Sequence, residues 1–498
     1  MDEGTTGRIW RLGLPALALW VGATRFASFD PSVADTDEAF YLLMGKAWVE
    51  GHPPYTAIWD VKPPGLLAVF AVLRLFFDPG FVVARAVTGI AVFVSALGLF
   101  RLARRHLEGR WTAVAAAAFY PAYSAVLFGL NTSPELLLAP LVILAMDQVL
   151  LLWTGKARRP IASCVVAGLL LGVAVLIKQS AVSELALAAV AAGPAGKANG
   201  AGLPAWRRTA LLLAAAALPS LLFIAYSVAE GIPAYLYLTP FLAPLFRLSG
   251  DGISFASGAL RFLPTLKPIL PLFAASLLLG AERRSLYGAP DARAIGFIGI
   301  WLAASAVAVV AMRSMYSHYD LTLLPAMSLL SALLLRTLAH KLPRHGPQAA
   351  AMLAVAACIY PVAWYWLVER PEARPAALAT RAVAALKADG FRPRDTLYVV
   401  NQDPAIYLLS DAGIPTRFAF TQHLMCDFRL PDTDAGQEIR RIMEGTPRFV
   451  VISHWRRWMI CERADRLDLV DRHLARSYDL LSTVEAAGEA VDIYRRRM

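Results

Sequence analysis

The sequence predicts a polytopic α-helical membrane protein that ends in a small α/β domain. Of its 498 residues, 57% are hydrophobic and only 17% are charged. Soluble proteins average roughly 45–50% apolar and about 25% charged residues. The apolar residues also gather in runs of ~20, the length of helix that crosses a bilayer core. After about residue 370 these runs shorten to the length of strands, and charged residues become more frequent.

About eleven segments are predicted to span the membrane, and the sixth and eighth of them are short. They are residues 10–26, 81–102, 112–130, 134–153, 161–177, 181–192, 209–229, 266–280, 295–312, 319–338 and 349–367. A further apolar run, 66–77, is too short to span a bilayer. We therefore expect an interfacial helix at this place.

Lys and Arg mark alternate connections between these spans, as at Arg101, Arg104 and Arg105. Short basic loops stay in the cytoplasm. This pattern predicts a cytoplasmic N-terminus and places residues 36–65 and everything after Val368 outside. The Lys and Arg residues of these loops account for the net charge of +11, and we expect them to contact anionic lipid head groups. No nucleic-acid partner is expected, because the chain has no basic module interleaved with aromatic residues.

Two domains are expected: a membrane domain at 1–369, whose first outside loop is 28–65, and an α/β domain at 370–498. The second domain is predicted to contain strands at 396–400 and 448–452, helices at 404–410, 434–444 and 463–476, and closing strands at 478–484 and 490–494. Cys426 and Cys461 both lie in it. A disulfide and two free thiols remain equally open for this pair.

The first outside loop carries charges in an otherwise apolar chain. Asp35, Asp37 and Glu38 cluster at its start, and Lys62 precedes two prolines at its end. Acids at this boundary fit a general base that serves a lipid-linked substrate. Alternatively, the acids merely cap a helix that begins near Ala39, and Lys62 extends from the interfacial helix toward water.

Other polar residues lie at span ends that the orientation places outside. Lys178 ends a span on the predicted outer side, where a cation is disfavoured, so it needs a ligand or a partner in the protein. Glu184 is the candidate partner if Lys178 binds no ligand. For His318 and Glu135 the alternatives are an ordinary interfacial histidine and a simple helix start. The complete set of such residues is Asn131, Glu135, Lys178, Arg313, His318 and Tyr319.

Several motifs resemble those of the GT-C glycosyltransferases. Asp37-Glu38 with Tyr41, followed by Lys62-Pro63-Pro64, is similar to their DE…Y…KPP arrangement. The segments 172–180, 317–325 and 401–418 also look like segments of this superfamily. It includes protein O-mannosyltransferases, lipid A aminoarabinose transferases and bacterial galacturonic acid transferases of lipopolysaccharide. The pieces occur in the expected order and cover both the predicted bundle and the tail.

The resemblance implies the GT-C fold and an inverting transfer of one sugar from a polyprenyl-phosphate carrier. The acceptor would be an envelope glycan, a glycolipid or a protein at the outer face of a bacterial inner membrane, with the C-terminal domain periplasmic. Asp37 would be the base, and Glu38 would orient it or bind the acceptor. The residues expected to bind donor phosphate or substrate are Tyr41, Lys62, Asn131, Glu135, Lys178, Arg313, His318 and Tyr319. We expect no cofactor and no strict metal requirement.

A transporter or flippase of lipid-linked sugars is the alternative function. Such proteins place polar residues near the middle of the bilayer, on interrupted helices that often occur in repeated halves. In this chain the notable charges lie at one predicted face, and no repeat of halves is evident. The sequence therefore favours the transferase.

Overall fold

The computed structural model describes residues 3–29, 35–77, 80–193, 204–250, 264–281, 290–311, 316–341, 344–370, 376–427, 430–456, 463–486 and 488–497. The chain forms two compact units. The helical unit consists of Met1–Phe29, Arg85–Ile224 and Arg247–Pro371, and the mixed unit consists of Asp30–Ala84, Ala225–Phe246 and Glu372–Met498. The first predicted outside loop thus shares a compact unit with the C-terminal part of the chain.

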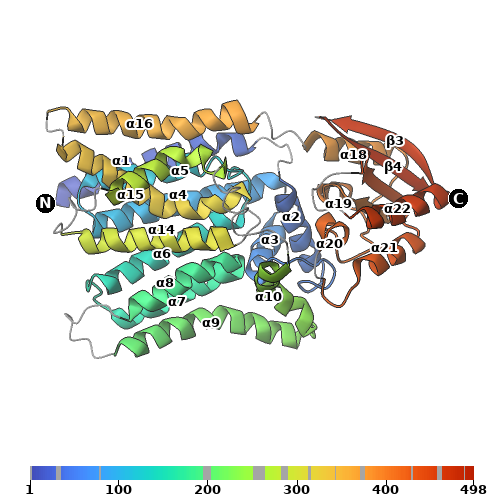
Figure 1. Ribbon diagram of the computed structural model, residues 1–498, viewed down its shortest axis with the longest axis horizontal. Helices are drawn as coiled ribbons and strands as arrows, with labels where there is room; N and C mark the ends of the chain where they lie inside the picture. The colour runs from blue at the N-terminus through green and yellow to red at the C-terminus, as the bar shows by residue number, and fades with distance from the viewer. Residues whose placement is uncertain are drawn as a thin grey trace. The chain divides into compact units, whose positions relative to one another are not determined.

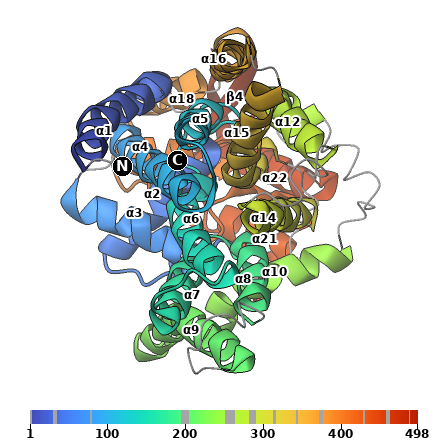
Figure 2. The ribbon, with the colours of Figure 1, turned by 90° about the vertical axis from the view of Figure 1, so that its left-hand side faces the viewer.

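The helical unit is a bundle of long helices that run side by side (Figure 1) and are seen end-on in Figure 2. Its main helices are α1 (Glu3–Arg25), α4 (Phe81–His106), α5 (Arg110–Tyr123), α6 (Pro134–Trp153), α7 (Pro160–Ile177), α8 (Val182–Ala192), α9 (Ala205–Ala229), α12 (Leu270–Ala281), α14 (Ala292–Ala311), α15 (Leu324–Lys341) and α16 (Gly346–Trp364). Shorter helical turns are η1 (Phe26–Phe29), η2 (Gln179–Ala181), η3 (Lys267–Ile269), η4 (Ser317–Leu323) and η5 (Tyr365–Glu369).

Seven of the described helices are long and apolar enough to cross a membrane: Phe81–His106, Pro134–Trp153, Pro160–Ile177, Ala205–Ala229, Ala292–Ala311, Ser317–Lys341 and Gly346–Glu369. Each corresponds to one of the predicted spans. The other four predicted spans are also helical, as α1 with 23 residues, α5 with 14, α8 with 11 and α12 with 12. The polytopic helical fold class is therefore confirmed.

The third predicted span, 112–130, is wrong in its length. The helix α5 stops at Tyr123. Leu127 and Phe128 have φ angles of 62° and 58°, which a right-handed helix does not allow. Their backbone amides donate to the carboxylate of Glu369, at 2.8 and 3.4 Å respectively. The helix therefore ends at Tyr123, and the chain continues to residue 130 as turns.

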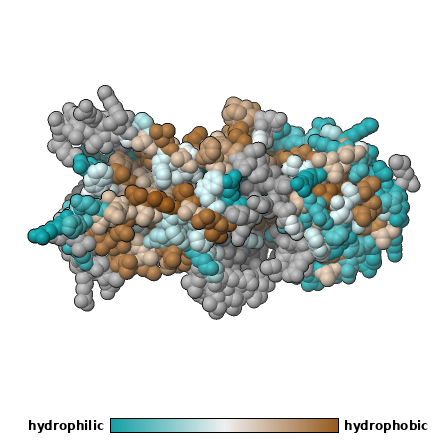
Figure 3. Space-filling model, turned by 90° about the horizontal axis from the view of Figure 1, so that it is seen from above, coloured by the Kyte–Doolittle hydropathy of each residue, from teal (hydrophilic) through white to brown (hydrophobic). Residues whose placement is uncertain are grey.

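Apolar side chains cover the outside of the bundle. Only 6% of the apolar window in Gly346–Glu369 is buried, and 17% of that in Ala205–Ala229. Figure 3 shows apolar surface over the helices and mostly hydrophilic surface over the C-terminal domain. Exposed apolar area of this extent would cause aggregation in water. It matches the lipid-facing surface of a membrane protein.

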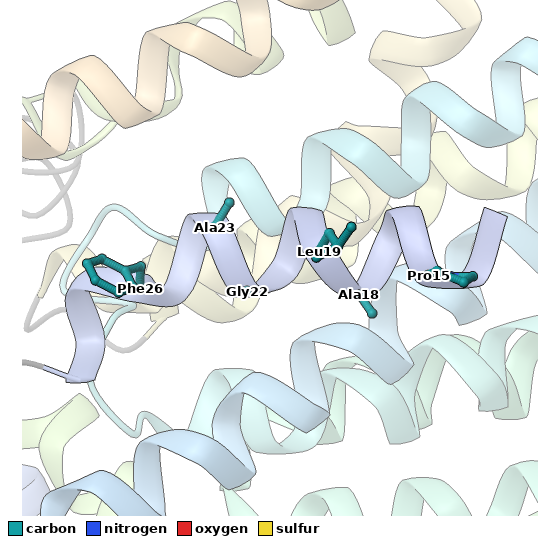
Figure 4. Close-up of a pocket in the computed structure, with 6 residues that line it drawn as sticks. All are labelled: Pro15, Ala18, Leu19, Gly22, Ala23 and Phe26. Carbon is teal, nitrogen blue, oxygen red and sulfur yellow. The ribbon is translucent and has the colours of Figure 1, made fainter. Parts of the chain in front are cut away.

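An open apolar pocket of about 790 Å³ lies along one face of α1 (Figure 4). It is lined by Pro15, Ala18, Leu19, Gly22, Ala23 and Phe26. None of these side chains can donate or accept a proton. The pocket therefore offers no acid–base chemistry, and the candidate site must be sought among the polar clusters.

The mixed unit combines a four-stranded sheet with short helices. Its helices are α2 (Thr36–Val49), α3 (Pro64–Phe76), α10 (Ala234–Gly250), α18 (Ala376–Ala388), α19 (Ala405–Ser410), α20 (Thr421–Met425), α21 (Ala435–Glu444) and α22 (Ala464–Ser477). The strands are β1 (Leu397–Val400), β2 (Phe449–Ser453), β3 (Tyr478–Ala486) and β4 (Glu489–Arg496), in the order β1-β2-β4-β3. β1 and β2 are parallel, and β4 runs antiparallel to both β2 and β3.

The strands and helices predicted after residue 370 are confirmed, each within two residues of its predicted bounds. Every residue of β1 and β2 is buried, as expected for continuous apolar runs in a sheet core. Asp434 caps α21 by accepting a hydrogen bond from the amide of Gln437. The sequence analysis did not identify α18 and α20. Cys426 is disulfide-bonded and Cys164 and Cys358 are free, whereas Cys461 lies outside the described residues.

Candidate functional site

The helix α2 places the acidic residues of the first loop. It begins at Thr36, earlier than predicted, and Asp35 caps it by accepting a hydrogen bond of 3.0 Å from the amide of Asp37. The capping alternative therefore holds for Asp35. Asp37 itself accepts a hydrogen bond of 2.9 Å from the hydroxyl of Tyr41, one helical turn later. Glu38 is fully buried. Asp37 is thus oriented by a neighbour and remains partly accessible.

Lys62 reaches this carboxylate from the loop before α3. Its ammonium lies 3.5 Å from Asp37 Oδ2 and 5.2 Å from the centre of the Tyr41 ring, within cation–π distance. Tyr55 donates a hydrogen bond of 2.9 Å to the backbone carbonyl of Lys62. Pro63 and Pro64 follow and start α3. The backbone of Lys62 is therefore held in place, and its side chain is directed toward Asp37 and Tyr41.

The close packing of α2 against α3 depends on Gly45. A Cβ atom at this position would lie 2.6 Å from the carbonyl carbon of Phe70, which is impossible without displacing a helix. Since α2 carries Asp37 and α3 follows directly after Lys62, this packing brings the two charged groups together. We refer to Asp37, Tyr41 and Lys62 as the loop cluster.

Burial and neighbouring carboxylates alter the acidity of Asp35. Its side chain is half-buried, and burial raises its pKa well above the usual range. The nearby carboxylates of Asp37 and Glu38 raise this pKa further, against the hydrogen bond from the Asp37 amide. The carboxyl of Asp35 therefore keeps its proton to a higher pH than a free aspartic acid does.

Asp403 contributes a further carboxyl to the same end of α2. Its Oδ2 lies 3.3 Å from the hydroxyl of Thr36, and its Oδ1 accepts a hydrogen bond of 2.8 Å from the amide of Ala405. Burial raises the pKa of Asp403 to about 6, despite these two donors, and Glu489 and Asp37 add to the increase. Asp403 lies in the segment 401–418 that resembles GT-C proteins, but the sequence did not single it out.

The raised pKa of Asp403 predicts a pH-dependent stability. The folded state favours the protonated acid, so this contribution is complete below about pH 4 and is lost as the pH rises through about 6. Asp403→Asn, which is neutral throughout, should be more stable than wild type above pH 6, by at most about 3 kcal/mol. Thermal unfolding of the full chain in detergent between pH 4 and 8 measures this difference. A difference that is the same at pH 4 and pH 7 would contradict the prediction.

A second cluster lies in the helical unit, where Glu135 in the first turn of α6 meets Lys178 at the end of α7. Lys178 donates to Glu135, and both side chains are almost completely buried. The alternative pairing of Lys178 is wrong, because Glu184 instead accepts hydrogen bonds of 2.7 Å from Ser183 and Ser305. The pair is a buried salt bridge. The attraction between such charges offsets the cost of removing them from water only when their geometry is good.

Two predicted residues complete this helix-end cluster of Glu135, Lys178, His318 and Tyr319. His318 Nε2 lies 4.0 Å from Glu135 Oε1, and the Lys178 ammonium lies 3.9 Å from the centre of the Tyr319 ring. The rings of His318 and Tyr319 meet edge to face at 4.7 Å. Asn131 is buried in the segment before α6, and Arg313 lies outside the described residues.

The loop cluster lies within the mixed unit and the helix-end cluster within the helical unit. Sequence reasoning missed two residues beside the loop cluster, Asp60 and His423. Asp60 had a signal, because it stands two positions before Lys62 in a charged loop. His423 had none, since only the tertiary fold brings it there. Among the described residues, no group of three or more His, Cys, Asp or Glu is arranged to hold a metal ion.

Comparison with known proteins identifies the fold. No family model and no curated protein sequence matches the chain, but solved structures do. ArnT from Cupriavidus metallidurans, bound to undecaprenyl phosphate, superposes with a TM-score of 0.64 at 17% identity, over 97% of this chain and 98% of that chain. The chain has the GT-C fold.

Two other GT-C structures are also similar. The archaeal oligosaccharyltransferase AglB from Archaeoglobus fulgidus, in complex with an inhibitory peptide and a dolichol-phosphate, gives a TM-score of 0.54 at 14% identity, over 90% of this chain and 70% of that chain. The mycobacterial arabinofuranosyltransferase AftD gives 0.54 at 15% identity, over 97% of this chain and 41% of that chain. The resemblance to GT-C proteins seen in the motifs is thus confirmed for the fold.

Proposed function

We propose that the chain is a membrane glycosyltransferase that moves a sugar from a polyprenyl-phosphate carrier to an acceptor. The observation that carries this proposal is the GT-C fold, shared over nearly the whole length with an ArnT structure bound to undecaprenyl phosphate. The AglB structure contains a dolichol-phosphate, which is likewise a phosphorylated polyisoprenoid lipid. Fold alone does not fix function, so the residues of the loop cluster supply the second part of the argument.

The loop cluster contains the groups that such a transfer needs. The acceptor hydroxyl attacks the anomeric carbon of the sugar while Asp37 takes its proton. The bond from that carbon to the carrier phosphate breaks with inversion, and its electron pair stays on the phosphate. Lys62 stabilises the negative charge that develops there. Tyr41 keeps Asp37 oriented through its 2.9 Å hydrogen bond.

The ion pair of Lys62 and Asp37 describes the resting state of this mechanism. At a separation of 3.5 Å the two groups attract each other without a tight contact, so the ammonium can move from Asp37 to a phosphate. An arriving donor phosphate attracts Lys62, and Asp37 is then released to accept a proton. Donor binding would thereby activate the base.

We assign the remaining predicted residues to substrate binding. Glu38 orients Asp37 or binds the acceptor, and the helix-end cluster with Asn131 and Arg313 contacts the donor head group or the sugar. The acceptor is an envelope glycan, a glycolipid or a protein at the outer face of a bacterial inner membrane. In this proposal the N-terminus is cytoplasmic, the C-terminal domain is periplasmic, and no metal is strictly required.

A transfer assay tests the proposal. The purified full chain in nanodiscs should move radiolabel from a polyprenyl-phosphate sugar to an acceptor glycan. Lys62→Ala should weaken donor binding and slow single-turnover transfer, whereas Lys62→Arg should keep part of both because the charge remains. Lys387→Ala, an exposed lysine of α18, is the matched control and should behave as wild type.

The same preparation distinguishes a flippase. In sealed vesicles, a flippase would carry the labelled lipid across the bilayer without transferring the sugar. Translocation without transfer would overturn the proposed function. Wild-type donor affinity and rate in Lys62→Ala would instead remove Lys62 from the phosphate site.

A further inference from the structure

We propose that Asp60 and His423 form a positioning pair that holds Lys62 at the loop cluster, so that a residue of the C-terminal domain organises the loop between α2 and α3. This inference rests on the proposed function for its catalytic meaning. The pair itself is a property of the mixed unit and can be tested without activity.

His423 is the donor of the pair. It lies on the short helix α20 and is 1% exposed. Its Nε2 lies 3.2 Å from Asp60 Oδ1 and hydrogen-bonds it. The imidazole ring packs against four aromatic rings from two distant parts of the sequence: Phe40, Trp59, Phe418 and Phe420. This enclosure fixes the ring plane and hence the direction of the hydrogen bond.

Asp60 uses its two oxygens for different partners. Oδ1 faces His423 and also accepts a hydrogen bond of 2.7 Å from the amide of Val61. Oδ2 lies 3.9 Å from the ammonium of Lys62. Burial alone would raise the pKa of Asp60, but the Lys62 charge and the His423 hydrogen bond outweigh it and hold this pKa below the usual range. Asp60 is therefore a buried anion aimed at Lys62.

The position of Lys62 depends on this anion. Its ammonium lies between two carboxylates, 3.5 Å from Asp37 and 3.9 Å from Asp60. When the ammonium leaves Asp37 for a donor phosphate, Asp60 still holds it beside the site. A long lysine side chain loses considerable entropy when it is fixed. Asp60, fixed by His423, provides a stationary partner that limits this loss during the reaction.

Two other contacts within the mixed unit join the segment 46–60 to the C-terminal domain. The amide of Trp59 donates a hydrogen bond of 2.8 Å to the carbonyl of Arg417. Lys46, near the end of α2, pairs with Asp411. The loop that carries Asp60 is thus attached to the C-terminal domain directly beside Asp60 and near the loop's start. These contacts hold the loop against the C-terminal domain, and the hydrogen bond from His423 orients the Asp60 side chain within it.

Chemical labelling of Lys62 tests the positioning without activity. An amine-acylating reagent is applied to the full chain in detergent, and the labelling rate of each lysine is measured by peptide mass spectrometry. In Asp60→Asn and His423→Phe, Lys62 should react about threefold to tenfold faster, the size expected within one hydrogen-bonded network. His423→Gln, which keeps an N–H donor, should stay close to wild type. Lys46 is the internal control for intact docking of α2.

The substitution His423→Phe separates the effect of the hydrogen bond to Asp60 from the effect of ring packing. It preserves an aromatic ring among the four neighbours and removes only the donor to Asp60. Unchanged Lys62 labelling in both Asp60→Asn and His423→Phe would overturn the proposal. Should His423→Phe fail to fold, Asp60→Asn alone decides, with exposed Asp468→Asn on α22 as its matched control.

The transfer rate tests whether the pair acts as one unit. Asp60→Asn and His423→Phe should each slow single-turnover transfer, and the double variant should be no slower than the slower single variant. Fully additive losses would overturn the coupling. If the wild type transfers no sugar, the proposed function fails while the labelling result still stands. If wild type is active and labelling and rates are unaffected, only the positioning pair fails.

Discussion

Asp37→Asn is expected to slow sugar transfer by roughly 10²–10⁴-fold, the usual contribution of a general base. The amide keeps the size of the side chain and can still accept the hydrogen bond from Tyr41, so the fold of α2 should not change. Donor binding should change far less than the rate, because Asp37 acts on the acceptor proton. Single-turnover transfer and equilibrium donor binding, measured on the same preparation, separate the two effects.

The matched controls are Asp468→Asn, at an exposed position, and Glu38→Gln in the same helical turn as Asp37. Asp468→Asn should retain full activity. Should Asp37→Asn keep more than half of the activity while Glu38→Gln abolishes it, the two carboxylates would exchange roles. A loss of donor binding as large as the loss of rate would instead show that Asp37 contributes to binding.

Removing either partner of the Glu135–Lys178 pair is expected to destabilise the protein strongly. Both side chains are almost fully buried, so Lys178→Met leaves an anion without its cation inside the helical unit. Breaking a buried ion pair in this way costs roughly 3–5 kcal/mol. Thermal unfolding of the full chain in detergent should show a markedly lower midpoint for Lys178→Met and for Glu135→Gln.

The double variant Glu135→Gln/Lys178→Met should recover most of this stability, because no isolated charge remains. Equal stability of the single variants and wild type would show that the pair is not buried as described. Donor binding by the double variant then addresses function. A stable double variant that no longer binds donor assigns the pair to the substrate, and normal binding limits it to a structural role.

The sequence analysis succeeded where the signal is local. The runs TLYVV and RFVVI predicted β1 and β2, since continuous apolar runs of strand length require burial. The DE…Y…KPP pattern led to Asp37, Tyr41 and Lys62, which the structure brings within hydrogen-bond or ion-pair distance. Asp37 and Tyr41 are one helical turn apart, and Lys62 joins them through the packing of two helices that are consecutive in the sequence.

It failed where distant segments decide the outcome. Apolar composition continues past Tyr123, but the backbone turns at Leu127 and Phe128, whose amides bind Glu369. No local pattern contains that interaction. The same holds for His423, which reaches Asp60 only because the C-terminal domain and the first loop share one compact unit. Neither α18 nor α20 has a long apolar run that would have revealed it.

The discontinuous make-up of the mixed unit also affects how the chain is made. Its first piece, Asp30–Ala84, is synthesised well before its last piece, Glu372–Met498. At a ribosomal rate of about 5–20 residues per second, the intervening residues take roughly 15–60 s. During this interval α2 and α3 exist without the aromatic residues on which Phe40 and Trp59 finally pack. The loop between α2 and α3 can therefore complete its packing only after the C-terminal residues have been synthesised.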